Sequence, residues 1–347
     1  MYHDILQQLT ELGDEMTAHR RALHQIPELA WNVPATSAYV ENALREIGLD
    51  PILFYDKILT AAVGRPGAAP IVMIRAEMDA LPVQEQGSLP FRPSTRNSHC
   101  SGHDLHMAMS LGLARALQAH AGALPGQVIF LFQPAGETAM GCKFILSRGI
   151  LDALGVRAVL AIHLNSATPT GCIQYQSGIV TSYLDAFYIS LTGRGSRGYA
   201  PHDGVTPLEM AAHIQLILGS LVQREVDARE HVVLSIGKAG GGTVTTHIPD
   251  TAQVWGTMRC FCPEIRSYLM ERVREVAGGV AAAYRGEAAV EFNSTPALIN
   301  DEGLARSIAP ALSELLGPDR FLRRRGPTIG SEDLSYLSQC PPTAFLQ

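Results

Sequence analysis

Apolar residues gather in short, nearly uninterrupted runs in the first half of the chain. The runs lie within residues 69–82, 126–137 and 156–164. Runs of this length are typical of strands that are buried on both faces of a parallel sheet. Residues 104–120, between two of the runs, show the spacing of a helix. Alternating buried strands and helices predict an α/β class, with a layered domain around a mostly parallel sheet.

The pattern changes from about residue 183. The stretch that begins there alternates apolar and polar positions, as a strand with one exposed face does. Long helical stretches follow at 206–225 and 263–286, among further strand patterns. This mixture predicts an inserted α+β domain, because residues 300–347 return to helix and short-strand patterns. We assign residues 1–182 and 295–347 to the main domain and residues 183–294 to the insertion.

The composition is that of a folded globular protein without a basic surface. Hydrophobic residues make up 46% of the 347 residues, charged residues 17%, and the net charge is −6. This charge argues against nucleic acid or an anionic membrane as a partner, and no apolar run reaches the roughly 18 residues that cross a bilayer. The first 23 residues predict an amphipathic helix and lack the features of a signal peptide. The six cysteines are scattered, so we expect a cytoplasmic protein with free thiols.

Three side chains that bind metals stand at the ends of the predicted elements. Glu137 and His163 lie at the ends of apolar runs, and His103 opens the predicted helix. Ligands of open α/β sheets collect beyond the carboxyl ends of the strands. Imidazole and carboxylate groups suit zinc, manganese, nickel or cobalt. A single histidine beside a buried strand is more often a hydrogen-bonded core residue, but the three together predict a metal site.

Ordered motifs along the chain resemble those of one enzyme family. They read HRRALHQIPELAW, IRAEMDALPVQEQG, SGHDLH, FLFQPAGE, AIHL, GRGSRGYAPHDGVTP, IPDTAQVWGTMR and SEDLSYL. The same order occurs in the metallopeptidase-type amidohydrolases, which include aminoacylases, hippurate hydrolases and auxin-conjugate hydrolases. The resemblance runs from about residue 19 to the end of the chain, and so many ordered motifs are specific for a fold.

The resemblance implies a two-metal catalytic domain and an inserted lid or dimerisation domain, with a homodimer formed through the insertion. It also implies hydrolysis of the amide bond of a small N-acyl or peptidyl amino acid. In such enzymes a metal-bridging water attacks the carbonyl and a glutamate accepts its proton. The metal ligands carried over from the family are His103, Glu137 and His163.

The implied site is incomplete in this sequence. The cysteine of the family's CGHD turn aligns with Ser101, and Cys100 stands one position early. A late histidine ligand of the family has no counterpart before Gln347. We therefore expect one well-held divalent ion per chain, or none, with Cys100 or Ser101 as candidates for a further ligand.

The family's general base aligns with Gly136, which has no side chain to accept a proton. Losing a general base typically costs about 10²–10⁴-fold in rate. Glu77, Asp79 and His99 are candidate replacements from nearby motifs. If none replaces it, the substitution Gly136→Glu is expected to raise hydrolysis by roughly 10²-fold or more.

The inserted domain carries further candidate residues for substrate binding. Arg197 aligns with a family histidine that binds the oxyanion, and an arginine can donate hydrogen bonds to an oxyanion or a carboxylate. Thr246 replaces a family asparagine, and His202 keeps its motif position. Arg259 also keeps its position and suits a substrate carboxylate, although a surface arginine on a strand fits the sequence equally well.

Three functions remain open at this point. The first is a metal-dependent amidohydrolase-like enzyme that acts on an N-acyl or peptidyl amino-acid derivative. The second is a repurposed enzyme on the same scaffold, which forms, cyclises or rearranges such a compound. The third is a non-catalytic homologue.

Overall fold

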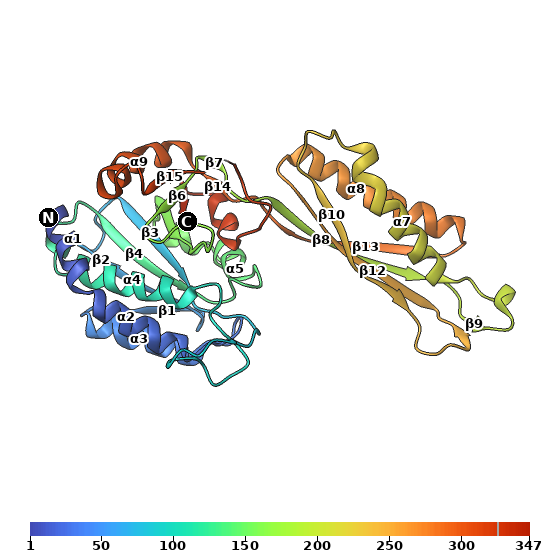
Figure 1. The fold of residues 1–347 in the computed structure, drawn as a ribbon, viewed down its shortest axis with the longest axis horizontal. Coiled ribbons are helices and arrows are strands. Elements are labelled where there is room, and N and C mark those ends of the chain that lie inside the picture. Colours follow the sequence, from blue (N-terminus) through green and yellow to red (C-terminus); the bar gives the residue numbers. More distant parts are fainter. Residues whose placement is uncertain (325) are drawn as a thin grey trace. The chain divides into compact units, whose positions relative to one another are not determined.

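The computed structural model describes residues 1–324 and 326–347, which divide into two compact units (Figure 1). The first unit comprises Met1–Val180, Leu298–Gly326 and Glu332–Gln347, and the second comprises Thr181–Ala297 and Pro327–Ser331. The short segment Pro327–Ser331 groups with the second unit, although its sequence position is among residues assigned to the main domain. The reason is local: the backbone N–H of Ser182 donates to the carbonyls of Thr328 and Gly330.

A six-stranded sheet forms the centre of the first unit, in the order β1-β2-β4-β3-β5-β16. β3 runs parallel to β4 and β5, β16 runs parallel to β5, and β2 is antiparallel to both of its neighbours. The predicted α/β class with a mostly parallel sheet is therefore confirmed. The strands are β1 (Ile52–Phe54), β2 (Ile58–Val63), β3 (Ile71–Glu77), β4 (Gln127–Gln133), β5 (Ala158–Ile162) and β16 (Thr343–Leu346).

Both faces of this sheet are buried, which explains the uninterrupted apolar runs. On β4, Phe130 and Phe132 belong to the core cluster that includes residues of α2, α3 and α4, whereas Ile129 and Leu131 belong to the cluster of α5 and α6. Successive side chains of a strand point to opposite faces, so one run supplies both cores. These helices are α2 (Gly13–His24), α3 (Pro34–Glu46), α4 (His103–Gln118), α5 (Gly141–Ser147) and α6 (Ile150–Ala153).

The remaining elements of the first unit are short or peripheral. The predicted single N-terminal helix is interrupted at Leu12, so that α1 (Tyr2–Glu11) precedes α2. The others are η1 (Ala121–Ala123), α9 (Glu302–Leu316), η3 (Asp333–Gln339), and the strand pairs β6 (Ile173–Tyr175) with β15 (Phe321–Arg323) and β7 (Gly178–Ile179) with β14 (Ile299–Asn300).

The second unit is an α+β layer of its own. Its antiparallel sheet has the order β10-β12-β8-β13, and its core joins this sheet to α7 and α8. Phe187, Ile189 and Leu191 of β8 are buried, while Tyr188 and Ser190 between them are exposed, as the alternating sequence pattern predicts. The elements are β8 (Tyr183–Thr192), β9 (Ser196–Arg197), η2 (Pro201–Asp203), α7 (Pro207–Glu225), β10 (Val233–Gly241), β11 (His247–Ile248), β12 (Thr251–Cys260), α8 (Pro263–Ala283) and β13 (Glu287–Thr295).

Among the described residues, no helix combines the length and the apolar character that a membrane crossing requires.

Candidate metal centre

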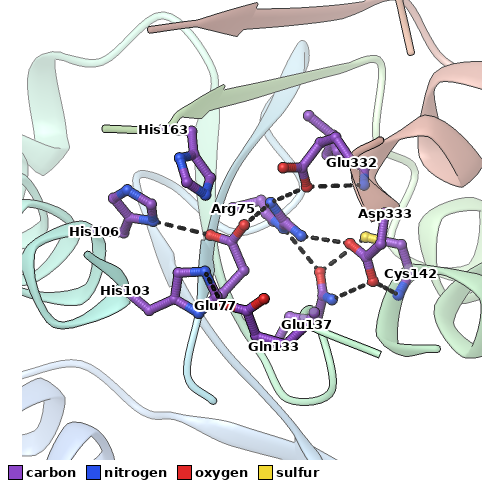
Figure 2. Close-up of polar contacts among 12 residues, drawn as sticks. Arg75, Glu77, His103, His106, Gln133, Glu137, Cys142, His163, Glu332 and Asp333 are labelled. Atoms are coloured by element: carbon purple, nitrogen blue, oxygen red, sulfur yellow. Dashed lines mark hydrogen bonds and ion pairs between the residues drawn. The ribbon is translucent and has the colours of Figure 1, made fainter. Parts of the chain in front are cut away.

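The parallel strands β3, β4 and β5 end at the same edge of the main sheet, and polar side chains gather there (Figure 2). One ligand atom each from Glu77, His103, His106 and His163 lies within 4.8 Å of the other three. Oε1 of Glu137 lies 3.7 Å from Nε2 of His103. The structure thus brings His103 and His163 into one cluster with Glu77 and His106, which were not proposed as ligands, whereas Glu137 approaches His103 from outside this cluster.

A left-handed glycine sets the start of α4 and therefore the place of His103. Gly102 has a φ of +83°, and a Cβ added there would lie 2.5 Å from Cδ1 of Leu164. Only glycine fits this combination of backbone angle and close approach. His103 and His106 follow three residues apart, so both face the strand ends from the same side of the helix.

Two of the histidines are oriented with one ring nitrogen free. The Nδ1–H of His103 donates to the carbonyl of Asp79 at 2.6 Å, and the Nδ1–H of His163 donates to the carbonyl of Leu164 at 2.8 Å. A carbonyl can only accept, so when each ring is neutral its Nε2 carries the lone pair. This arrangement is the usual one for a metal-binding histidine, whose second nitrogen is held by an acceptor.

His106 differs because both of its ring nitrogens are occupied. Its Nδ1–H donates to Oε2 of Glu77 at 3.1 Å, and its Nε2 accepts the backbone N–H of Leu164 at 3.0 Å. Burial lowers the pKa of His106, in keeping with a neutral ring. His106 therefore orients Glu77 and has no nitrogen left for a metal.

Glu137 carries a buried oxygen that lacks a hydrogen-bond partner among the described residues, namely Oε1. The turn that presents it is held by Asp79, which accepts the backbone N–H groups of Gly136 at 2.9 Å and Glu137 at 3.2 Å. Burial raises the pKa of Asp79 to about 6. A buried carboxylate oxygen without a hydrogen-bond partner costs free energy. A cation bound between it and the nearby imidazole nitrogen would remove this cost.

A second network of buried polar side chains lies beside this group, and its members are hydrogen-bonded to one another. Arg75 donates to Gln133 at 2.8 Å, to Glu332 at 3.0 Å and, in shorter contacts, to Glu77 and Asp333. Gln133 in turn donates to Asp333 at 2.8 Å. Arg75 and Asp333 were not among the residues predicted from the sequence. The spacing of Arg75 and Glu77 on one face of β3 was the available signal.

The buried charges fit a divalent cation. Among the described residues of this network, Arg75 supplies the positive charge, and the carboxyl groups of Glu77, Glu332 and Asp333 surround it. Burial raises the pKa of Asp333 to about 7, so Glu77 and Glu332 are the anions that together exceed the single charge of Arg75. Burial would raise the pKa of Glu77, but Arg75 and the histidines hold it well below its usual range. Burial lowers the pKa of His163, yet Glu77 and Glu332 outweigh it and leave that pKa raised. Excess negative charge at such depth is costly without a counter-ion.

The other predicted ligands lie at a neighbouring cavity of about 930 Å³. Cys100 is exposed and Ser101 is half-buried, and both line this cavity with His99 and His163. Cys100 contributes no ligand atom to the cluster found among the described residues. Both ring nitrogens of His99 are buried and have no hydrogen-bond partner in the described part of the chain, and burial lowers the pKa of His99 to about 4, which leaves the ring neutral.

The structure adds a packing constraint to the prediction for Gly136→Glu. A Cβ added at this position would lie 2.9 Å from Cγ of Glu77 and 3.3 Å from Oδ1 of Asp79. The Glu77 side chain is itself held by Arg75 and His106. The substitution Gly136→Glu therefore does not simply restore an acid, because it displaces Glu77.

The predicted substrate-binding residues all belong to the second unit. Arg197 and Thr246 are neighbours, since the N–H of Gly198 donates to the carbonyl of Thr246 and Arg197 pairs with His247. His202 is exposed in η2. Arg259 lies at the far end of β12 from β11, where it donates to the carbonyl of Ile329 at 3.0 Å.

Comparisons with known proteins agree with this geometry. Peptidase family M20/M25/M40 matches residues 73–347. The chain is 31% identical over 345 residues to an N-acetyl-L-cysteine deacetylase of Bacillus subtilis, covering 97% of this chain and 80% of that one. It is 33% identical over 343 residues to the IAA-amino acid hydrolase ILR1-like 2 of Arabidopsis thaliana, covering 96% and 76%.

A solved structure also indicates this family. The YXEP protein of Bacillus subtilis, described as a dinuclear metal-binding peptidase of the M20 family, superposes with a TM-score of 0.81 at 29% identity. The match covers 97% of this chain and 88% of that protein. The chain is therefore an enzyme of peptidase family M20/M25/M40.

Proposed function

We propose that this enzyme hydrolyses the amide bond of small N-acyl amino acids, with one divalent ion held by His103, Glu137 and His163. The observation that carries the proposal is that Nε2 of His103 and Nε2 of His163 are oriented in one cluster, and that the Oε1 atom of Glu137, which has no hydrogen-bond partner among the described residues, lies 3.7 Å from Nε2 of His103. The deacetylase and the auxin-conjugate hydrolase, by their names, act on amino-acid derivatives of this class. None of the comparisons supports the non-hydrolytic alternative or a non-catalytic homologue.

The chemistry divides between the ion and the chain. When bound, the metal would polarise the amide carbonyl and make water more acidic. His103 and His163 hold their Nε2 atoms in place through backbone carbonyls, and Asp79 fixes the turn that carries Glu137. The cavity beside His163 offers room for a small substrate.

The proton acceptor is a separate question, because Gly136 provides none. Both carboxylate oxygens of Glu77 and of Asp79 already accept hydrogen bonds. His99 is the candidate whose two ring nitrogens lack partners among the described residues, and it lines the cavity. Burial lowers the pKa of His99 to about 4, so its ring gains a proton poorly at neutral pH, and His99 stays a candidate base beside Glu77 and Asp79.

The second unit is assigned as the lid and dimerisation domain, with Arg197, His202, Thr246 and Arg259 as candidates for substrate contact. Its surface supports association, since β10 is an edge strand and α7 exposes Leu208, Leu216 and Ile217. Sedimentation is expected to show a dimer, and a monomer at working concentrations would contradict the assignment. The cytoplasmic location stays a prediction.

A panel of N-acyl amino acids tests the function directly. Metal-free protein is loaded with zinc or manganese, and release of the free amino acid is measured. The expected result is hydrolysis that a chelator abolishes and added metal restores. Metal-loaded protein that releases no amino acid from any member of the panel would overturn the hydrolase assignment.

A further inference from the structure

The side chain of Glu77 fills the space that a side chain at position 136 would need. A Cβ on Gly136 would meet both Cγ of Glu77 at 2.9 Å and Cβ of Glu77 at 3.5 Å. Glu77 ends β3, and Gly136 lies in the turn after the adjacent parallel strand β4, whose last residue Gln133 pairs with Glu77. The absence of a side chain at position 136 and the placement of the Glu77 carboxylate are therefore linked by packing.

The Glu77 carboxylate reaches the free imidazole nitrogens. It belongs to the cluster in which all ligand atoms lie within 4.8 Å of one another, with His103 and His163 (Figure 2). We propose that Glu77 is a metal ligand of this enzyme, in a rebuilt site that Gly136 makes possible. The inference rests on the proposed metal-dependent function and places the Glu77 carboxylate beside His103 and His163 as a ligand of its site.

The hydrogen bonds of Glu77 favour a ligand over a base. His106 donates to Oε2 and Arg75 donates to Oε1, so the carboxylate is fixed by two donors. Each oxygen keeps a further lone pair that a metal can use. A base, in contrast, must gain a proton, and the guanidinium of Arg75 opposes this step. The His106–Glu77 contact is the kind of outer contact that orients a metal ligand.

The charge of Arg75 does not prevent cation binding. Arg75 also donates to Glu332 and Asp333, so three carboxyl groups share one guanidinium. A divalent ion at Glu77 therefore enters a pocket with excess negative charge.

Zinc titration of metal-free protein tests the inference. Isothermal titration calorimetry measures affinity, and metal analysis after dialysis counts ions per chain, for the unmodified enzyme and for Glu77→Gln. Removing an outer contact of a metal site typically costs about 10–100-fold in affinity, and the loss of a ligand is expected to reach at least the upper end of this range. Glu332→Gln is the matched control, because it also removes one carboxylate partner from Arg75. It should weaken binding much less.

A second variant covers the case in which Glu77→Gln does not fold. Gly136→Ala changes no charge, but its Cβ must displace Glu77, so zinc affinity should fall. Circular dichroism confirms that each variant is folded. If the unmodified enzyme binds zinc and both folded variants bind it equally tightly, Glu77 is not a ligand, although the proposed function stands. If the unmodified enzyme binds no metal, the proposed function fails, and this inference fails with it.

Discussion

Two neighbouring groups of buried polar side chains sit at the same strand ends but differ in how they are satisfied (Figure 2). In the arginine network, Arg75, Gln133 and Asp333 bond to one another. In the ligand group, His103 and His163 each keep one free nitrogen, and Glu137 keeps an unpaired oxygen. The two groups share the strand ends, although His163 and Glu137 are only half-buried, and they differ most in how many of their hydrogen-bonding atoms have partners.

This difference separates a structural role from a binding role. A fully bonded polar network stabilises one arrangement of the chain, whereas buried groups without partners cost free energy unless a ligand completes them. The comparison predicts that changes in the arginine network mainly affect folding, and that changes in the ligand group mainly affect metal binding.

The largest effect is expected for Arg75→Ala. The substitution leaves the buried carboxylates of Glu77 and Asp333 without their cation, and breaking a buried pair in this way typically costs about 3–5 kcal/mol. Urea unfolding of the metal-free protein measures the loss. Arg229→Ala removes an exposed ion pair with Asp227 and should leave stability unchanged. If the two variants are equally stable, the arginine network is not structural.

His163→Ala should show the opposite behaviour. His163 is only half-buried, and its Nδ1–H bonds to the adjacent carbonyl, so the free energy of unfolding of the metal-free protein should change little. Zinc affinity should fall by about 100-fold or more, as judged from the effects of weaker perturbations. The exposed His202 provides a control through His202→Ala. Unchanged zinc affinity in His163→Ala would place the metal elsewhere.

A smaller effect should appear in the pH dependence of the metal-free protein. The folded-state pKa of Asp79 is about 6, above its ordinary value of 3.8, so this group favours the folded state at low pH and loses that contribution as the pH rises through 6. Between pH 5 and 7.5 this loss is about 1.4 kcal/mol.

The measurement is urea unfolding at the two pH values. In the unmodified protein the free energy of unfolding should include the Asp79 loss between pH 5 and 7.5. In Asp79→Asn this part of the difference should be absent. An identical pH dependence in both proteins would show that Asp79 is not buried as a costly anion.

The sequence alone predicts those parts of the fold that follow from the burial pattern of a single strand. The apolar run of β4 predicts that both faces of the strand are buried, and its side chains do pack into two hydrophobic clusters, one on each face of the sheet. The positions of His103, Glu137 and His163 follow from the rule that ligands gather at strand ends. The start of the second unit can also be recognised in the sequence, because apolar and polar residues alternate along β8.

The rest depends on contacts between distant segments. Asp333 reaches Arg75 from 258 positions away, and no local pattern signals that contact. The overlap between Glu77 and position 136 arises only when β3 and β4 pair in register. For the same reason, the sequence could suggest that an acid is missing at Gly136 but not that another acid occupies its space.

The metal centre is proposed to hold one ion through His103, Glu137 and His163. Anomalous scattering from crystals of the zinc-loaded enzyme tests this claim directly. The expected result is a peak about 2.0–2.2 Å from Nε2 of both histidines and from a carboxylate oxygen of Glu137. A zinc-loaded crystal with no peak at this position, or with its peak at Cys100 and His99 instead, would contradict the account.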